Sequence, residues 1–228
     1  CIRKEILEKA GAETIYFVGA IGGLIRLKEL DEDNIKSTVL GGQSIARTAM
    51  AVENEIKLRP VLNLIRQEYY SQCDNYVLAL AQKVGILKSN AANTGKGSLN
   101  LSIHTEMSYF ELGGLKLLFL PCELFPELAY GGYLDADCSA EGKSPDINPA
   151  PLLRIAEDDN MLIFCLANDF TGYVVPPNDF YLNPKEPYIN GGRDRLDRRH
   201  YEETNSLGPE TAPIIANVFA DIMNTVNK

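Results

Sequence analysis

Residues 111–127 read ELGGLKLLFLPCELFPE, and this stretch decides the fold class. Gly113 and Gly114 stand between two strand-like runs, which is the pattern of a tight hairpin turn. The second run, residues 115–120, is apolar and has the length of a strand. Glu123 follows this strand almost at once. The stretch therefore predicts a hairpin with a carboxylate just beyond its second strand.

A second apolar strand is predicted at residues 161–168, which read MLIFCLAN. The turn that leaves it carries Tyr173. Ligand crevices in α/β sheets form outside the carboxyl ends of strands. Glu123 and Tyr173, from neighbouring strand ends, could therefore bind a metal or position a substrate. The alternative is structural, because a Glu after a strand is often a helix-terminal or solvated residue and a Tyr in a turn is often a packing residue.

The rest of the chain alternates helical and strand patterns, which predicts a layered α/β fold. Apolar residues recur at helical spacing in residues 2–10, before Gly11, and Gly22 and Gly23 form a turn. Two long irregular stretches, residues 135–151 and 176–200, could be lids over a site or disordered insertions, which composition alone does not distinguish. The other predicted elements are a strand over residues 14–20, helices over residues 44–58 and 75–87, a strand over residues 99–110, a short helix over residues 124–130 and an amphipathic helix starting near Pro209.

Composition excludes several classes of protein. The chain has 228 residues, of which 45% are hydrophobic, and its net charge is −9. This is an ordinary balance for a globular protein, and no apolar run approaches the roughly 20 residues of a membrane span. The single basic stretch, residues 193–199, contains Asp194 and Asp197, so nucleic acid is not an expected partner.

Cysteine and histidine usage limits the chemistry. The five cysteines are an odd number without a close pair, which indicates neither a disulfide framework nor a CxxC metal site. The two histidines, His104 and His200, lack the HxH or HExxH spacing of zinc sites, and we expect both to be structural. Cys1 could be a nucleophile, a lipid-bearing terminus or the point where a longer chain was cut. The helical pattern around it favours the cut.

Four segments of the chain, in the same order, resemble the neutral/alkaline non-lysosomal ceramidase family of zinc amidases. Pro121-Cys122-Glu123-Leu124 is similar to the Pro-Gly-Glu-Phe motif of that family, and Asn168 with Tyr173 to its Asn-x-x-x-x-Tyr turn. The segments are residues 1–25, 111–127, 166–180 and 200–215. The resemblance implies a layered mixed sheet with flanking helices, as in the ceramidase catalytic domain.

The resemblance also implies a zinc ion held by two His, one Glu and one Tyr. Glu123 and Tyr173 match the last two ligands, and Tyr173 could also stabilise the oxyanion. Asn168 and Tyr201 are candidate substrate contacts. The two His ligands are expected upstream of this sequence, so residues 1–228 would be the C-terminal portion of the catalytic domain, without its N-terminal half. Family resemblance suggests a secreted, periplasmic or cell-surface location.

One departure weakens the ceramide assignment. Where ceramidases read Gly-Asp-Val-Ser-Pro, this chain has Ile25 in place of the Ser. A zinc-activated water could still attack an amide carbonyl. We therefore expect a zinc-dependent amidohydrolase acting on an N-acyl lipid or a related amide. The alternatives are a catalytically inactive binding domain of the same fold and, third, a hydrolase that uses Cys1 as its nucleophile.

Overall fold

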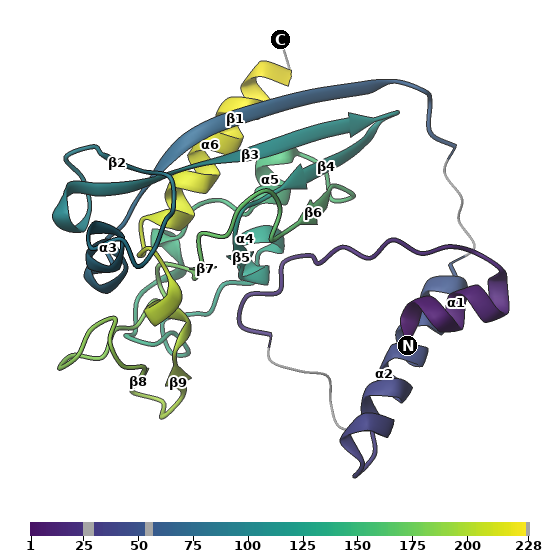
Figure 1. The fold of residues 1–228 in the computed structure, drawn as a ribbon, viewed down its shortest axis with the longest axis horizontal. Coiled ribbons are helices and arrows are strands. Elements are labelled where there is room, and N and C mark those ends of the chain that lie inside the picture. The colour runs from purple at the N-terminus through teal and green to yellow at the C-terminus, as the bar shows by residue number, and fades with distance from the viewer. Residues whose placement is uncertain (25–29, 53–56, 227–228) are drawn as a thin grey trace. The chain divides into compact units, whose positions relative to one another are not determined.

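The computed structural model describes residues 1–24, 30–52 and 57–226 of the chain (Figure 1). These residues fall into two compact units. The first comprises residues 1–17 and 24–58, and the second comprises residues 18–23 and 59–228. The candidate residues Glu123, Tyr173, Asn168 and Tyr201 all belong to the second unit.

The first unit is built from two helices that contact each other, α1 (Ile2–Ala10) and α2 (Asn34–Met50). α1 ends as predicted at Gly11, which takes the left-handed backbone conformation with a φ of 64°. The side chain of Asp33 caps α2 by accepting two backbone N–H groups of its first turn.

The helix predicted over residues 44–58 is displaced in the structure. α2 begins ten residues earlier and ends at Met50, and residues 53–56 lie outside the described part of the chain. The first half of this helix was not predicted, because it contains Gly41 and Gly42 and glycine is unfavourable inside helices. Packing explains the glycine, since a Cβ on Gly42 would lie 2.5 Å from the Cβ of Cys1.

A mixed sheet forms the centre of the second unit, with the strand order β1-β3-β4-β6 (Figure 1). β3 pairs with β1 and β4 in antiparallel fashion, whereas β4 and β6 run parallel. The short β2 pairs with the start of β3 on the edge opposite to β1, since both strands pair with Ser102 and Ile103. The bounds are β1 (Leu62–Gln72), β2 (Ala91–Asn93), β3 (Leu101–Leu112), β4 (Leu115–Phe119) and β6 (Leu162–Phe164). The predicted mixed sheet with flanking helices is confirmed.

The hairpin at Gly113 and Gly114 is confirmed. Both glycines have positive φ angles, 60° and 101°, which residues with side chains rarely adopt. The turn joins β3 to β4, and β4 then leads to Pro121 as the apolar pattern predicts.

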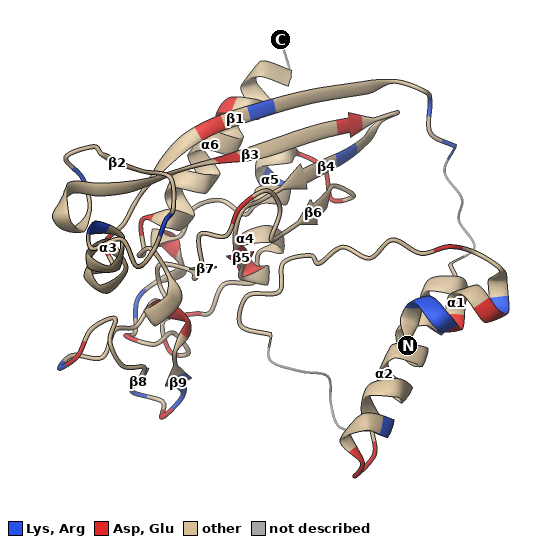
Figure 2. Cartoon of the chain, viewed as in Figure 1, with Lys and Arg blue, Asp and Glu red and all other residues tan. Residues whose placement is uncertain are grey.

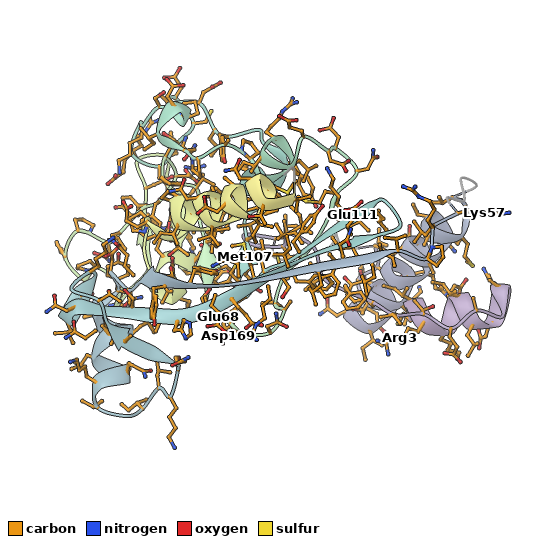
Figure 3. The ribbon with its side chains drawn as sticks, turned by 90° about the horizontal axis from the view of Figure 1, so that it is seen from above. Arg3, Lys57, Glu68, Met107, Glu111 and Asp169 are labelled. Atoms are coloured by element: carbon orange, nitrogen blue, oxygen red, sulfur yellow. The ribbon has the colours of Figure 1, made fainter. Side chains whose placement is uncertain are left out.

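The core lies between one face of the sheet and the closing helix α6 (Thr211–Val226). Met107 and Tyr109 of β3 and Leu118 of β4 are buried there with Phe219 of α6. Figure 3 shows Met107 on the side of the sheet where α6 runs, and Glu68 and Asp169 on the opposite side. Two short helices, α4 (Pro126–Tyr130) and α5 (Leu152–Ala156), complete this layer.

The remaining elements are short and lie in the segments between the sheet strands or between β6 and α6. Two of them, β5 and β7, form a separate parallel pair, and β8 and β9 form an antiparallel one. Their bounds are α3 (Tyr76–Lys83), η1 (Ser98–Asn100), β5 (Glu123–Leu124), η2 (Pro145–Ile147), β7 (Tyr173–Val174), β8 (Gly192–Arg193), β9 (Arg199–His200) and η3 (Glu202–Asn205).

The strand predicted over residues 14–20 is wrong. This segment has no strand assignment, although the carbonyl of Val18 accepts a hydrogen bond from the backbone of Cys165 at 3.0 Å. The chain passes from the first unit to the second at Val18. Residues 14–17 of the predicted strand therefore belong to one unit and residues 18–20 to the other. The turn at Gly22 and Gly23 follows as predicted.

Helices long and apolar enough to span a bilayer are absent from the described ranges of the chain.

Candidate functional site

Glu123 and Tyr173 lie directly opposite each other in the parallel pair β5–β7 (Figure 1). The backbone N–H of Glu123 donates to the carbonyl of Gly172 at 3.0 Å, and that of Phe125 donates to the carbonyl of Val174 at 3.1 Å. Side chains of directly paired residues project to the same side of a ladder. The register therefore brings together two side chains that are distant in sequence.

A glycine at position 172 is required for this register. Gly172 has a φ of 89°, and a Cβ at this position would collide with the carbonyl oxygen of Asn205. β7 can thus approach both β5 and the segment that contains η3. This close approach fixes the position of the Tyr173 backbone.

The Tyr173 phenol is held in its neutral form. Burial raises its pKa well above the ordinary value, and hydrogen bonds with Glu123 and Tyr201 raise it further. A neutral phenol can donate a hydrogen bond to the Glu123 carboxylate, which can only accept. The pair therefore combines a hydrogen-bond donor and a carboxylate at one point.

Tyr201 completes this group of side chains. Its ring meets the ring of Tyr173 edge to face, with 5.9 Å between centroids and an angle of 84° between planes. Tyr201 immediately precedes η3 and is 43% exposed, so it forms the solvent side of the group. The structure brings Glu123, Tyr173 and Tyr201 together.

The structure places Asn168 elsewhere. Its side chain is directed toward Ser108 on β3, with 3.5 Å between Asn168 Nδ2 and the hydroxyl oxygen. It lines a polar cavity of about 310 Å³ together with His104 and Asp169. The Asn168 side chain therefore lies at the sheet face. Its amide group forms its hydrogen bond there and not with the phenol of Tyr173.

Neither histidine of the chain joins Glu123 and Tyr173. His104 stacks on Tyr70 of the neighbouring strand, with 4.8 Å between centroids, and its Nε2 lies 3.2 Å from a Glu68 carboxylate oxygen. His200 is buried in another group of charged residues. Among the residues that the structure describes, no group of three or more His, Cys, Asp and Glu side chains is placed to hold a metal ion.

The glycine turn of residues 22–23 packs against β5. The N–H of Gly22 donates to the carbonyl of Leu124 at 2.8 Å, and a Cβ on Gly22 would lie 2.7 Å from the backbone nitrogen of Phe125. This turn therefore contacts the two residues that follow Glu123. Ile25, where that family has a Ser, lies outside the described residues.

The cysteines offer little reactivity near the site. Cys122 and Cys165 are buried in the core, and burial raises the pKa of Cys165 to about 11. Burial also raises the pKa of Cys122, which adjoins Glu123. Cys1 is an exposed free thiol in the first unit.

The basic stretch over residues 193–199 folds onto acidic partners and backbone carbonyls. Arg193 pairs with Asp197 at 2.9 Å, and Arg195 donates to the carbonyls of Ala136 and Asp137. Figure 2 shows both signs of charge close together around β8 and β9. These arginines are therefore occupied within the fold.

A partly buried group of charged residues in this region was not predicted. Arg198 bridges Asp179 and Asp194, at 2.9 and 2.7 Å. His200 lies between Asp194 and Glu203, with Nε2 3.2 Å from Asp194 Oδ2 and Nδ1 2.9 Å from Glu203 Oε1. We call Asp179, Asp194, Arg198, His200 and Glu203 the charged cluster. In the sequence, the cluster is visible only as an alternation of acidic and basic residues. This pattern is equally typical of a solvated loop.

The charges of the cluster stabilise one another. Burial alone would lower the pKa of His200, but Glu203 and Asp194 raise it above its ordinary value. Burial alone would raise the pKa of Asp194, but the hydrogen bonds from Arg198 and His200 hold it well below its usual range. The neighbouring carboxylates therefore favour the protonated form of His200.

Comparisons of this chain with protein-family models, with curated proteins and with solved structures found no match. The evidence for its function therefore comes from its own residues.

Proposed function

We propose that this chain supplies Glu123 and Tyr173 to the zinc centre of an amidohydrolase that cleaves an N-acyl lipid or a related amide. The observation that carries the proposal is the β5–β7 register, which sets a carboxylate and a phenol from distant segments directly opposite each other. The ceramidase resemblance assigns the Glu and Tyr ligands to these same two residues.

The two side chains fit half of such a site. Zinc in proteins is commonly held by four ligands, and carboxylate oxygen is one of the accepted donors. Glu123 and Tyr173 offer two oxygens from rigidly paired backbone. The proposal assigns the other two ligands to histidines upstream of Cys1.

Zinc in such a centre supplies a bound water whose pKa is lowered to about 7. Glu123 would help to hold the zinc ion through its carboxylate. The Tyr173 phenol can donate a hydrogen bond to the oxyanion that forms when the amide carbonyl is attacked. Tyr201 packs against the phenol and limits where its oxygen can point.

A mainly apolar cavity supports a lipid-like substrate. It has a volume of about 190 Å³ and begins beside Gly172, the residue that precedes Tyr173. Its apolar wall includes Leu78, Ile103 and Leu207. Part of an acyl chain could lie there, against the residue that precedes Tyr173 in the chain.

The test compares zinc content and amidase activity of the polypeptide extended upstream of Cys1. We expect Glu123→Gln and Tyr173→Phe each to weaken zinc binding at least about tenfold, in line with losses seen when metal-site residues are changed. N-acyl lipid hydrolysis should fall in parallel. Matched controls are Glu111→Gln on β3 and Tyr130→Phe on α4, which should keep both zinc and activity.

Two results would contradict this proposal. Wild-type zinc content in Glu123→Gln would remove Glu123 from the centre. Zinc binding without hydrolysis of any amide would favour the binding-domain alternative over an enzyme.

A further inference from the structure

β1 is the border strand of the sheet, and no strand lies on its outer side among the residues that the structure describes (Figure 1). It pairs with β3 residue by residue over its whole length, Leu62–Gln72, without a bulge. Its sequence, LNLIRQEYYSQ, contains none of the proline, glycine or lysine residues that commonly protect exposed edges. A long and regular border strand of this kind is a template for pairing with a further strand.

The hydrogen bonds with β3 show which backbone groups of β1 point outward. At the two ends of β1, the N–H of Cys73 donates to the carbonyl of Leu101 at 3.0 Å, and the N–H of Gly113 donates to the carbonyl of Val61 at 2.7 Å. Both pairs continue the β1–β3 register, so the odd-numbered residues of β1 are the ones bonded to β3. The even-numbered residues therefore direct their N–H and C=O groups to the outer side.

The charges of β1 are complementary to a second, antiparallel copy of the same strand. An outer partner must bond to the even-numbered residues, so two copies pair even with even. With Gln67 on the two-fold axis, Arg66 of each copy lies directly opposite Glu68 of the other copy. Moving the axis to Arg66 or to Glu68 would set like charges opposite each other, which is unfavourable across strands.

The same register covers apolar side chains that are exposed in the single chain. Leu64 and Tyr70 are both more than half exposed. They share the face of Glu68, opposite to α6, because alternate residues of a strand point to one side (Figure 3). In this register Leu64 of each copy lies opposite Tyr70 of the other, with Cα atoms about 5.5 Å apart, so each leucine contacts a tyrosine ring.

The existing contacts of these residues are compatible with a second copy. The guanidinium of Arg66 contacts the carboxylates of Glu68 and Glu106 within the chain, and its side chain is 58% exposed. It has five N–H donors, so it can also reach Glu68 of the other copy. The outward carbonyl of Glu68 accepts from the Gln67 side chain at 2.9 Å and keeps a second lone pair.

We propose that two copies of this chain associate through β1, in antiparallel orientation, with Gln67 of each copy on the two-fold axis. The same surface serves both copies, so the assembly closes as a dimer and joins the two sheets into one. β5 and β7, which carry Glu123 and Tyr173, form a pair outside this sheet. The interface is therefore independent of the proposed zinc centre.

Sedimentation equilibrium of the full chain measures the association. We expect a concentration-dependent mass that approaches twice the 25.2 kDa of one chain. Arg66→Glu and Glu68→Arg each set like charges opposite each other at both symmetric positions, and each should weaken the dimer at least about tenfold. Lys83→Glu, an equal charge reversal at the exposed end of α3, should change the dissociation constant less than about threefold.

Mixing the two weakened variants separates charge pairing from damage to the fold. When Arg66→Glu associates with Glu68→Arg, every introduced charge lies opposite an opposite charge. We therefore expect the mixed dimer to form with a dissociation constant within about tenfold of the wild-type value. Failure of the mixed dimer to form would contradict this register.

A disulfide measures the register directly, in a chain whose exposed Cys1 and Cys138 are replaced by Ser. Residues opposite each other in a non-hydrogen-bonded antiparallel pair have Cα atoms about 4.5 Å apart, which a disulfide can span. Gln67→Cys should therefore link two copies under mild oxidation. Asn63→Cys is the matched control, because its two copies would lie about 26 Å apart along the paired strands.

Two results would overturn the proposal. One is a wild-type mass that stays at 25.2 kDa up to about 0.1 mM, which would leave the β1 edge unpaired or to another polypeptide. The other is a Gln67→Cys crosslink that forms no faster than that of Asn63→Cys. Neither measurement depends on zinc or amide hydrolysis, so this proposal and the proposed function can fail separately.

Discussion

His200 is a buried side chain whose hydrogen-bond partners all come from one region of the fold. Asp194 and Glu203 hydrogen-bond to its two nitrogens, Arg198 and Asp179 complete the charged cluster, and the Tyr181 ring lies 5.2 Å away. Breaking such a buried pair is costly because the remaining charge is left without compensation. The cluster therefore holds the segment over residues 179–203 together.

The charge of His200 makes stability depend on pH. The pKa of His200 is raised in the folded protein, whereas it is about 6.5 in an unfolded chain. The stability contributed by the proton is therefore complete below about pH 6.5 and is lost as the pH rises through the folded-state pKa. We expect His200→Asn to lower the free energy of unfolding by about 2 kcal/mol at acidic pH and by clearly less in alkaline solution.

Urea unfolding at about pH 6 and about pH 9 checks this prediction, since those values bracket the shift that linkage requires. His104→Asn is the control, because His104 lies on the sheet, away from the charged cluster. An equal loss at both pH values in His200→Asn would mean that the imidazole acts through packing alone.

The element that positions Tyr201 is tied to α3 by one asparagine. The Asn75 side chain caps α3 by accepting from the N–H groups of Val77 and Leu78, at 3.1 and 3.2 Å. It also donates to the carbonyls of Thr204 and Ser206, at 3.1 and 3.0 Å. One buried side chain thus joins the start of a helix to η3.

We expect Asn75→Ala to lower the free energy of unfolding by about 3 kcal/mol, because it removes a helix cap and leaves two carbonyls without donors. Amide hydrogen exchange across residues 202–205 should accelerate as η3 loosens. Ser144→Ala provides the comparison, since Ser144 caps η2 through a single exposed hydrogen bond and should cost less than about 1 kcal/mol. Unchanged exchange in η3 would show that Asn75 acts only as a cap.

The elements that the sequence predicts are those with local signals. The glycine pair between two strand-like runs identifies the β3–β4 hairpin, and Gly11 ends α1 as expected. β1 was not predicted, because it is exposed along most of its length and its side chains do not alternate cleanly between polar and apolar. Pairing with β3 along the whole strand, residues 62–72, is what makes it a strand.

In the candidate site, too, only the features with a local sequence signal could be predicted. Glu123 and Tyr173 were predicted as strand-end residues, and each prediction used only the residues around it. Their direct pairing, the displacement of Asn168 to the sheet face and the charged cluster depend on contacts between distant segments. Periodicity within one segment does not encode which segments meet, so these features required the fold.

At the scale of the whole molecule, the second unit includes a segment from far upstream. Val18 and Gly22 each make a backbone hydrogen bond with this unit, to Cys165 and to Leu124. Ala20 is buried in the core between them. The second unit is therefore not continuous in sequence.

We expect a chain of residues 59–228 to be less stable than the full chain by about 2–4 kcal/mol, because it lacks these hydrogen bonds and the buried apolar contacts around Ala20. Amide exchange in β4 and β6 measures the effect within the second unit. A chain of residues 12–228, which lacks α1 but keeps residues 18–23, should protect these strands as the full chain does. Equal protection in the 59–228 chain would show that residues 18–23 do not stabilise the second unit.

The parallel pairing of β5 with β7 also dictates when the two residues can meet. Parallel neighbours need a long crossover, and here the whole of residues 125–172 separates them. Closing such a loop is an entropic cost that only later contacts offset. A chain still emerging from the ribosome therefore carries Glu123 before its partner exists, and the pair cannot form until residues 125–174 have also been made.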